Sequence, residues 1–225
     1  MTSQYGQDEF VVEVLGGMRE GFFLDSGASD GLQASNTRLL EQSFDWTGIC
    51  IEPNTEFFAR LLENRRCVCV NCCLYDREGH VEFLEAGTVG GILHEYDPSL
   101  LRCAKDLLRV AEGSAPPTVR RAARTVRSVL EACAAPPVID YWSLDTEGSE
   151  LAILSSFPFD RYSFRVLTIE HNWLPVRSRI RTFLERRGYR WVREAGCDDC
   201  YVRHDVAHRP SWRSGAWRRA GVTPP

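Results

Sequence analysis

The chain has 225 residues, a formal net charge of −4, 44% hydrophobic and 26% charged residues, 17 Gly and 11 Pro. These values favour one globular domain and exclude a collagen, a coiled coil and a globally disordered chain. Because the sequence has neither an apolar run of about 18 residues nor a basic, apolar signal peptide at its start, we expect a cytoplasmic protein without a membrane span.

The first half of the chain repeats a strand–helix unit. Each predicted strand is a short, continuous apolar run, which is typical of a strand buried on both faces of a parallel sheet. In the second predicted helix, Phe58, Leu61 and Leu62 should share the buried side. The predicted strands cover 21–25, 48–52 and 67–71, with a further extended piece over 81–85, and the predicted helices lie within 34–44 and 55–64.

Regular elements return in the second half after a less regular segment. Two Pro-Pro pairs lie within 87–137, which we interpret as a cap or insertion with helical periodicity over 98–111 and 127–135. We expect a single domain over 1–210 and a C-terminal tail over 211–225, which carries Trp212 and Trp217. Predicted strands follow over 138–145 and 165–170, then a basic helix over 176–187 that stops at Gly188, and an antiparallel pair over 189–194 and 201–204.

This alternation predicts an α/β fold: a doubly wound, mostly parallel sheet of the Rossmann-like type, closed by an antiparallel C-terminal hairpin. In such sheets, ligands bind beyond the carboxyl ends of the strands. The polar residues at the predicted strand ends are Asp25, Glu52, Asn71, Asp145 and the pair Glu170-His171. Capping of the following helices would explain one or two of these acids, but a ligand or metal better explains the whole set.

The glycine pattern restricts the class of ligand. The first predicted turn reads Asp25-x-Gly27-x-x-x-Gly31, whereas a nicotinamide dehydrogenase would show G-x-G-x-x-G, and no P-loop motif occurs. A carboxylate before the first Gly would repel a pyrophosphate and suits a ligand with an amine and a sulfonium. Glu52, which lies 27 residues after Asp25, can accept hydrogen bonds from both hydroxyls of a ribose.

Several ordered blocks resemble the FkbM-type S-adenosylmethionine-dependent methyltransferases. The resemblance covers about residues 3–190, although this chain has Ser29 where the family often has Asn. The matching blocks are SQYGQD (3–8), FLDSGASDG (23–31), SNT (35–37), WTGICIEP (46–53), NR (64–65), IDYWSLDTEGSE (139–150) and LTIEH (167–171).

The resemblance implies a Rossmann-like class I methyltransferase and a map of the cofactor. Asp25, Ser26, Gly27 and Ala28 would line the methionine end, with a contribution from Asn36. Glu52 and Pro53 would hold the ribose, and Asn71 and Cys72 would border the adenine. Asp145 would close the site near the cofactor amine.

Methyl transfer to a hydroxyl requires alignment of the acceptor and removal of a proton. His171 titrates near neutrality and is the first candidate for the base, with Asp145 and Glu170 beside it; the alternative is a structural histidine. Asp145, Glu147 and Glu170 could together hold Mg²⁺, but a helix N-terminus explains the first two equally well, so we assign no metal ligand. His94 could approach from a lid.

The cysteines and the arginines each allow two interpretations. Nine cysteines cannot all pair within one chain, and although Cys197-x-x-Cys200 has zinc-ligand spacing, we interpret the cysteines as core-filling thiols. Residues 177–225 carry +7 and residues 1–176 carry −11, with Arg providing 26 of the 27 basic residues. A coding bias toward Arg explains this better than a nucleic-acid surface, since no binding motif accompanies it.

The sequence therefore predicts an O-methyltransferase that acts on a small hydroxylated metabolite such as a sugar or a polyketide. The alternatives are an N-methyltransferase, a nucleic-acid-directed methyltransferase and a non-catalytic nucleoside-binding module. Nothing in the sequence indicates an oligomeric state.

Overall fold

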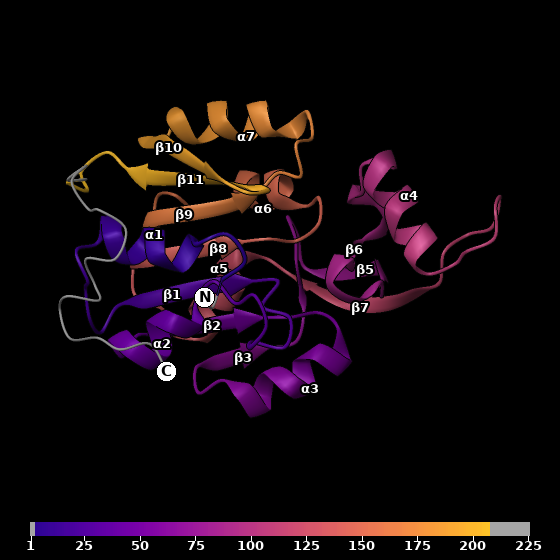
Figure 1. The fold of residues 1–225 in the computed structure, drawn as a ribbon, viewed down its shortest axis with the longest axis horizontal. Helices are drawn as coiled ribbons and strands as arrows, with labels where there is room; N and C mark the ends of the chain where they lie inside the picture. The colour runs from indigo at the N-terminus through magenta and orange to yellow at the C-terminus, as the bar shows by residue number, and fades with distance from the viewer. Residues whose placement is uncertain (1–2, 208–225) are drawn as a thin grey trace.

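The computed structural model describes residues 3–207, so the predicted tail with Trp212 and Trp217 lies outside the described residues. Its main sheet has the strand order β10-β11-β9-β8-β1-β2-β3 (Figure 1). Strands β1, β2, β3, β8 and β9 are parallel, and β11 is antiparallel to β9 and β10. The strands are β1 Phe22–Ser26, β2 Thr47–Ile51, β3 Val68–Val70, β8 Val138–Leu144, β9 Ser163–Glu170, β10 Tyr189–Ala195 and β11 Asp198–Arg203. The prediction of a doubly wound, mostly parallel sheet with an antiparallel C-terminal hairpin is confirmed.

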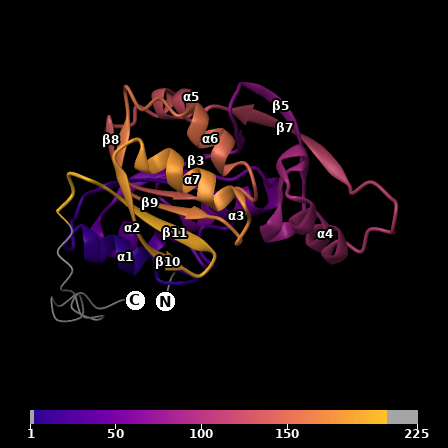
Figure 2. The same ribbon diagram turned by 90° about the horizontal axis from the view of Figure 1, so that it is seen from above.

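Helices cover both faces of this sheet, and Figure 2 shows α5 and α6 on one side and α1 and α2 on the other. The apolar side chains of α5, α6 and α7 belong to one core cluster, and those of α1, α2 and α3 belong to a second. The six helices are α1 Gln7–Val14, α2 Arg38–Phe44, α3 Thr55–Asn64, α5 Val126–Ala132, α6 Glu150–Ser156 and α7 Val176–Glu185. None of the helices within residues 3–207 has the length and apolar character needed to cross a membrane.

The apolar strand runs are explained by these two cores. Successive side chains of a strand point to opposite faces, so Leu24 and Trp142 enter the first core while Phe23 and Tyr141 enter the second. All four side chains are fully buried, and each contributes about 1.5–3 kcal/mol of hydrophobic stabilisation. The central strands therefore have no polar face.

Helix α3 begins where the sequence predicts, because the Asn54 Oδ1 atom accepts hydrogen bonds from the backbone N–H groups of Glu56 and Phe57. The prediction that Leu62 shares its buried side is wrong. Leu61 is fully buried, but Leu62 is 56% exposed. Adjacent residues are about 100° apart around a helix, and in α3 Leu61 faces the sheet whereas Leu62 faces outward.

A second sheet, which the sequence analysis did not predict, lies beside the carboxyl ends of the parallel strands (Figures 1 and 2). The extended piece over 81–85 belongs to this sheet. The segment predicted as an insertion also holds α5, whose Val129 and Leu130 belong to the first core of the main sheet. The second sheet has the order β4-β7-β5-β6, and its region comprises β4 Cys73–Leu74, β5 Gly79–Leu84, β6 Gly91–Ile92, β7 Thr118–Arg124, the short 3₁₀ helices η1 Gly87–Val89 and η2 Leu93–Glu95, and α4 Pro98–Leu107.

The two sheets are joined by a close backbone contact. Gly148, in the loop after β8, has φ +121°, and a Cβ there would lie 2.7 Å from the carbonyl oxygen of Glu95. The two main chains can approach this closely only because Gly148 has no side chain.

Candidate functional site

The acidic residues predicted at the strand ends meet at one edge of the main sheet, on the side of the second sheet (Figure 1). Asp25 lies in β1 and Glu170 ends β9, while Glu52 and Asp145 directly follow β2 and β8. Asp25, Glu52 and Glu170 are buried and Asp145 is half-buried. Because the four strands are parallel, their carboxyl groups gather where open α/β sheets bind ligands.

Gly27 makes the turn after β1 with φ +86°. A Cβ at this position would lie 1.9 Å from the carbonyl oxygen of Asp145. The backbone N–H groups of Gly27 and Ala28 both donate to the carbonyl oxygen of Ile51 at 3.0 Å. The turn thus packs the ends of β1, β2 and β8 against one another, at a place that only glycine can occupy.

Asp25 is held through Thr37 by a buried guanidinium. The Thr37 hydroxyl donates to Asp25 Oδ2 at 2.5 Å, and Arg65 Nη2 donates to Thr37 Oγ1 at 2.9 Å. Burial raises the pKa of Asp25 to about 6, although Arg65 and the Thr37 bond lower it. Asp25 therefore has a compensating positive charge on the protein side.

Glu52 is fixed by two backbone N–H groups. Ser29 donates to its Oε2 at 2.8 Å and Asn54 to its Oε1 at 2.7 Å. Burial raises the pKa of Glu52 to about 7 and outweighs these two bonds, which lower it. Asn71 supports the same loop differently, because its side-chain amide donates to the carbonyl oxygens of Glu52 and Pro53.

Asp145, Glu147 and Glu170 form a carboxyl cluster in which one oxygen of each lies within 4.8 Å of the others. Burial and the neighbouring carboxyl groups raise the pKa values of Asp145 and Glu170 well above the usual range. Burial and the nearby Glu150 raise the pKa of Glu147 to about 7. Like charges this close require shared protons or a cation. The cluster can therefore receive a cationic ligand or accept a proton.

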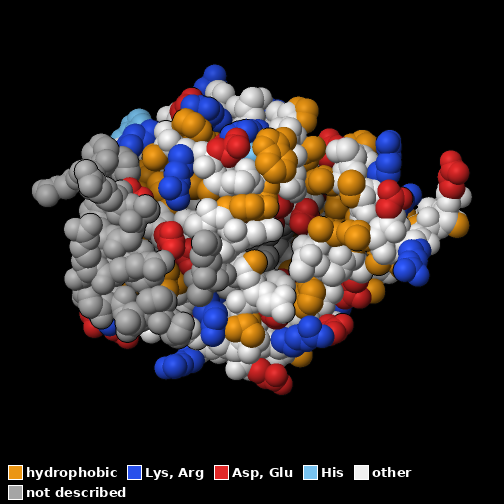
Figure 3. All heavy atoms as spheres, in the orientation of Figure 1, with side chains coloured by type: hydrophobic (Ala, Val, Ile, Leu, Met, Phe, Trp, Pro, Cys, Tyr) orange, Lys and Arg blue, Asp and Glu red, His pale blue; other side chains and the backbone are white. Residues whose placement is uncertain are grey.

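Two adjoining cavities open at this edge, and Figure 3 shows the surface hollowed between the main body and the part that holds α4. The smaller cavity lies against the ends of β1 and β2 and the second sheet, and the larger extends from the turn at Gly27 to Trp173. Asn71 and His171 line neither of them. Of the other predicted residues, Ser26, Gly27, Glu52, Pro53, Cys72 and Asp145 line the smaller cavity, and Asp25, Gly27, Ala28, Asn36, Asp145 and Glu170 line the larger.

Asn36 offers an unused acceptor to the larger cavity. Its Nδ2 donates to the Ser143 hydroxyl at 2.9 Å, whereas its Oδ1 is buried without a protein partner. A buried acceptor without a partner costs about 1–3 kcal/mol. A ligand with a hydrogen-bond donor would remove this cost.

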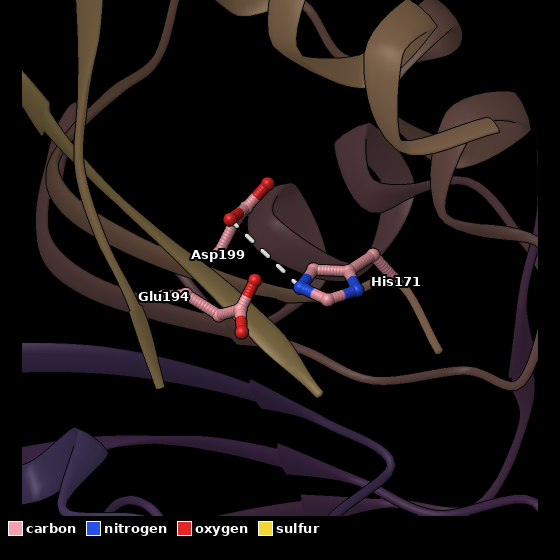
Figure 4. Close-up of side chains that lie close together, drawn as sticks. All are labelled: His171, Glu194 and Asp199. Carbon is pink, nitrogen blue, oxygen red and sulfur yellow. Dashed lines mark ion pairs between the residues drawn. The ribbon is translucent and has the colours of Figure 1, made fainter. Parts of the chain in front are cut away.

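His171 follows β9, and its ring lies beside Glu194 and Asp199 (Figure 4). Its Nδ1 accepts the backbone N–H of Trp173 at 3.0 Å, so the neutral ring carries its proton on Nε2. Nε2 lies 3.8 Å from Asp199 Oδ1 and makes no hydrogen bond. Burial lowers the pKa of His171 and outweighs the nearby Asp199, which raises it.

The carboxylates beside His171 already have a cation. Arg177 donates to both oxygens of Asp199, at 2.9 and 2.6 Å, and lies 2.6 Å from Glu194 Oε2. Trp191 Nε1 also donates to Asp199 at 2.6 Å. This cluster is therefore a structural support for the loop after β9 rather than a metal site.

Sequence reasoning missed several residues of the larger cavity, among them Asn172, Trp173 and Asp198. Trp173 is 64% exposed, and both Asn172 and Trp173 have left-handed backbones, with φ of +44° and +54°. Asp198 begins β11 and accepts a hydrogen bond from Gln7 Nε2 at 2.9 Å. Each lies next to a motif noted in the sequence, since Trp173 follows His171 by two residues and Asp198 lies between Cys197 and Cys200.

The remaining features noted in the sequence are the cysteines and His94. All nine cysteines are free thiols, and no group of metal-ligating residues found within 3–207 includes a cysteine. Cys197 lines the larger cavity, whereas Cys200 is buried in β11. His94 lies 2.7 Å from the Tyr75 hydroxyl and lines neither cavity.

The family model described as "Methyltransferase FkbM domain" matches residues 25–191. No curated protein matches the chain. Among solved structures, the chain is similar to precorrin-6y C5,15-methyltransferase from Geobacter metallireducens, with 12% identity, a TM-score of 0.44 and coverage of 87% of this chain and 85% of that one. It is also similar to the METTL16 methyltransferase domain, with 10% identity, a TM-score of 0.44 and coverage of 86% of this chain and 64% of that one. The similarity to M. jannaschii TYW2, in complex with AdoMet, has 11% identity, a TM-score of 0.39 and coverage of 90% of this chain and 78% of that one.

Proposed function

Because the chain belongs to the FkbM methyltransferase family, we propose that it transfers a methyl group from S-adenosylmethionine to a hydroxyl of a small molecule. The observation that carries this proposal is the pair of adjoining cavities that share Gly27 and Asp145. One cavity presents the fixed Glu52 carboxyl group, and the other provides carboxyl groups for a cation and a proton. When bound, the cofactor supplies an electrophilic methyl group on a sulfonium.

We assign the two ends of the cofactor to the two cavities. Glu52 faces the smaller cavity with a fixed carboxyl group that can accept the ribose hydroxyls, and Cys72 lies in the wall beyond it. The turn at Gly27 leads to the larger cavity, where Asp25 and Asn36 offer acceptors to the ammonium group. In this assignment Asn71 acts indirectly, by holding the backbone of the Glu52 loop.

The second sheet forms the acceptor side in this proposal. Thr88 and Val89 of η1 and Leu100 of α4 line the larger cavity together with the carboxyl cluster and the exposed Trp173. The carboxyl groups of this cavity favour a neutral or cationic acceptor, because the phosphates of a nucleic acid would be repelled. We also propose a cytoplasmic location, which suits nine free thiols.

We propose the carboxyl cluster as the base. A base works best when its pKa is near the working pH, and burial and the nearby Glu150 raise the pKa of Glu147 to about 7. Burial and the neighbouring carboxyl groups raise the pKa values of Asp145 and Glu170 well above the usual range. His171 has its Nδ1 occupied by the Trp173 N–H and lines neither cavity. Its predicted role as the base therefore stays a prediction, and the geometry favours a role in holding the Trp173 loop.

An His171→Asn variant distinguishes the two roles. The amide oxygen of Asn can accept the Trp173 N–H, but an amide cannot act as a general base. We expect His171→Asn to retain most of the turnover and His171→Ala to lose more, measured as release of S-adenosylhomocysteine in the presence of an acceptor. Equal and complete loss of turnover in both variants would support His171 as the base.

The function as a whole is tested by calorimetric titration of the wild-type protein with S-adenosylhomocysteine, followed by a methyl-transfer screen. The screen pairs neutral hydroxylated metabolites with amines and with RNA. We expect binding with one ligand per chain and transfer to a hydroxyl compound. No binding would overturn the proposal, binding without any transfer would favour a nucleoside-binding module, and transfer to an amine or RNA alone would overturn the acceptor class.

A further inference from the structure

Three thiols lie on one face of the sheet where β2 meets β3. Cys50 of β2 is paired in register with Cys69 of β3, and Cys67 precedes β3 by one residue. The Sγ atoms of Cys50 and Cys67 are 3.5 Å apart, and Cys69 Sγ donates to the carbonyl oxygen of Cys67 at 3.6 Å. The two sulfur atoms of Cys50 and Cys67 are thus already in contact.

The surroundings distinguish Cys67 from the other thiols. Cys67 is half-buried, whereas Cys50 is completely buried. Hydrogen bonds with Cys50 and Cys69, followed by the charge of Arg65, lower the pKa of Cys67. Burial instead raises the pKa of Cys72 to about 12. Since the thiolate is the reactive form, Cys67 is the thiol of this group that reacts with an oxidant.

We propose that Cys67 and Cys50 are a site of reversible oxidation, which hydrogen peroxide converts into a disulfide that weakens the cofactor site. The Cys67 thiolate attacks one peroxide oxygen, the O–O bond breaks, and a sulfenic acid and hydroxide form. The Cys50 sulfur then attacks the sulfur of the sulfenic acid and loses its proton, while the hydroxyl group leaves as water. Two thiols and one peroxide give one disulfide and two waters, and the two electrons pass from sulfur to oxygen.

The motion required falls on Cys67. A disulfide has an S–S distance of about 2.05 Å, so the two sulfurs must approach by roughly 1.5 Å. Cys50 lies inside β2, between β1 and β3, whereas Cys67 lies in the connection between α3 and β3. The backbone N–H of Cys67 donates to Glu41 Oε1 at 2.8 Å, and Arg65 Nε donates to Glu41 Oε2 at 2.5 Å. A displacement of Cys67 therefore acts on Glu41 and Arg65.

The same arginine leads to the cofactor site. Arg65 holds Thr37, Thr37 holds Asp25, and Asp25 is the register partner of Cys50. If Asp25 receives the cofactor ammonium, as the proposed function requires, the disulfide should lower the affinity for the cofactor. The coupling rests on that function, whereas the disulfide itself does not.

The test uses the full chain, first reduced with dithiothreitol and then treated with equimolar hydrogen peroxide. Peptide mapping after alkylation identifies the linked cysteines, and calorimetry measures binding of S-adenosylhomocysteine. We expect a linkage between the peptides of Cys50 and Cys67, an affinity at least about fivefold weaker, and recovery of both after renewed reduction.

Matched variants test the assignment. Cys67→Ser and Cys50→Ala should show neither the linkage nor the loss of affinity, and Cys67→Ser alone suffices if Cys50→Ala does not fold. Cys69→Ser keeps the pair and should behave as the wild type. Absence of the linkage, or linkage through Cys69, would overturn the site, and linkage without a change in affinity would overturn the coupling. If the reduced wild type does not bind S-adenosylhomocysteine, the proposed function fails while peptide mapping still decides the disulfide.

Discussion

Replacing Gly27 with alanine is expected to abolish binding of S-adenosylhomocysteine and to lower the free energy of unfolding. The new Cβ would lie 1.9 Å from the carbonyl oxygen of Asp145, in a turn with φ +86°. The left-handed conformation costs an L-residue about 1–2 kcal/mol, and overpacking adds about 1–3 kcal/mol. Relief of the contact requires the ends of β1 and β8 to separate, and these ends form the boundary shared by both cavities.

Gly16→Ala is the matched control for this experiment. Gly16 also has a left-handed backbone, with φ +64°, but no atom lies within 4 Å of a Cβ placed there. In this variant the free energy of unfolding should fall only by the cost of the left-handed conformation, about 1–2 kcal/mol, and S-adenosylhomocysteine should bind as to the wild type. Thermal melts and calorimetry measure both effects. Normal binding by Gly27→Ala would show that the turn does not contact the cofactor.

Replacing Glu52 with alanine should weaken binding of S-adenosylhomocysteine by about 1–3 kcal/mol, or roughly 5- to 150-fold, because hydrogen bonds to a charged group are lost. Glu56→Ala is the control. Glu56 lies one turn further along the chain in α3, where it is exposed and paired with Arg60. Both variants remove a carboxyl group from the same region, so a difference in calorimetric affinity reports the cofactor contact. Equal affinities would remove Glu52 from the site.

Glu52 should also give the affinity a pH dependence. Burial raises its pKa from 4.5 to about 7, so ionisation of Glu52 destabilises the unliganded fold as the pH rises between these values. The ionised carboxyl group is the better acceptor for ribose hydroxyls, and binding therefore favours it. The affinity of the wild type should rise from about pH 6 to about pH 8, and Glu52→Gln should lack this component. A wild-type affinity that falls over this range would contradict the assignment.

The sequence predicts the main sheet well because burial on both faces leaves continuous apolar runs. The runs that contain Leu24 and Trp142 are of this kind, and the acids that follow them mark the edge where the two cavities open. Helix α3 was predicted with its observed bounds, since Pro53 and Asn54 define its start. The positions of residues that directly follow a buried strand could therefore be predicted from the sequence.

The second sheet and the orientation of His171 were not predictable in this way. Strands β4 and β6 have two residues each, too few to show a period, and β5 pairs with β7 across a long intervening segment. The sequence places His171 after β9, but the left-handed backbones of Asn172 and Trp173 decide on which side of the loop its ring lies. Such conformations depend on tertiary contacts rather than on residue type.

The contact between Gly148 and the Glu95 carbonyl brings the main chains of the loop after β8 and of η2 together with no side chain between them. This contact tolerates substitutions in η1 and α4, which line the larger cavity. Under the proposed function, such substitutions would change the acceptor and leave the strand ends of the main sheet, and with them the cofactor side, unchanged.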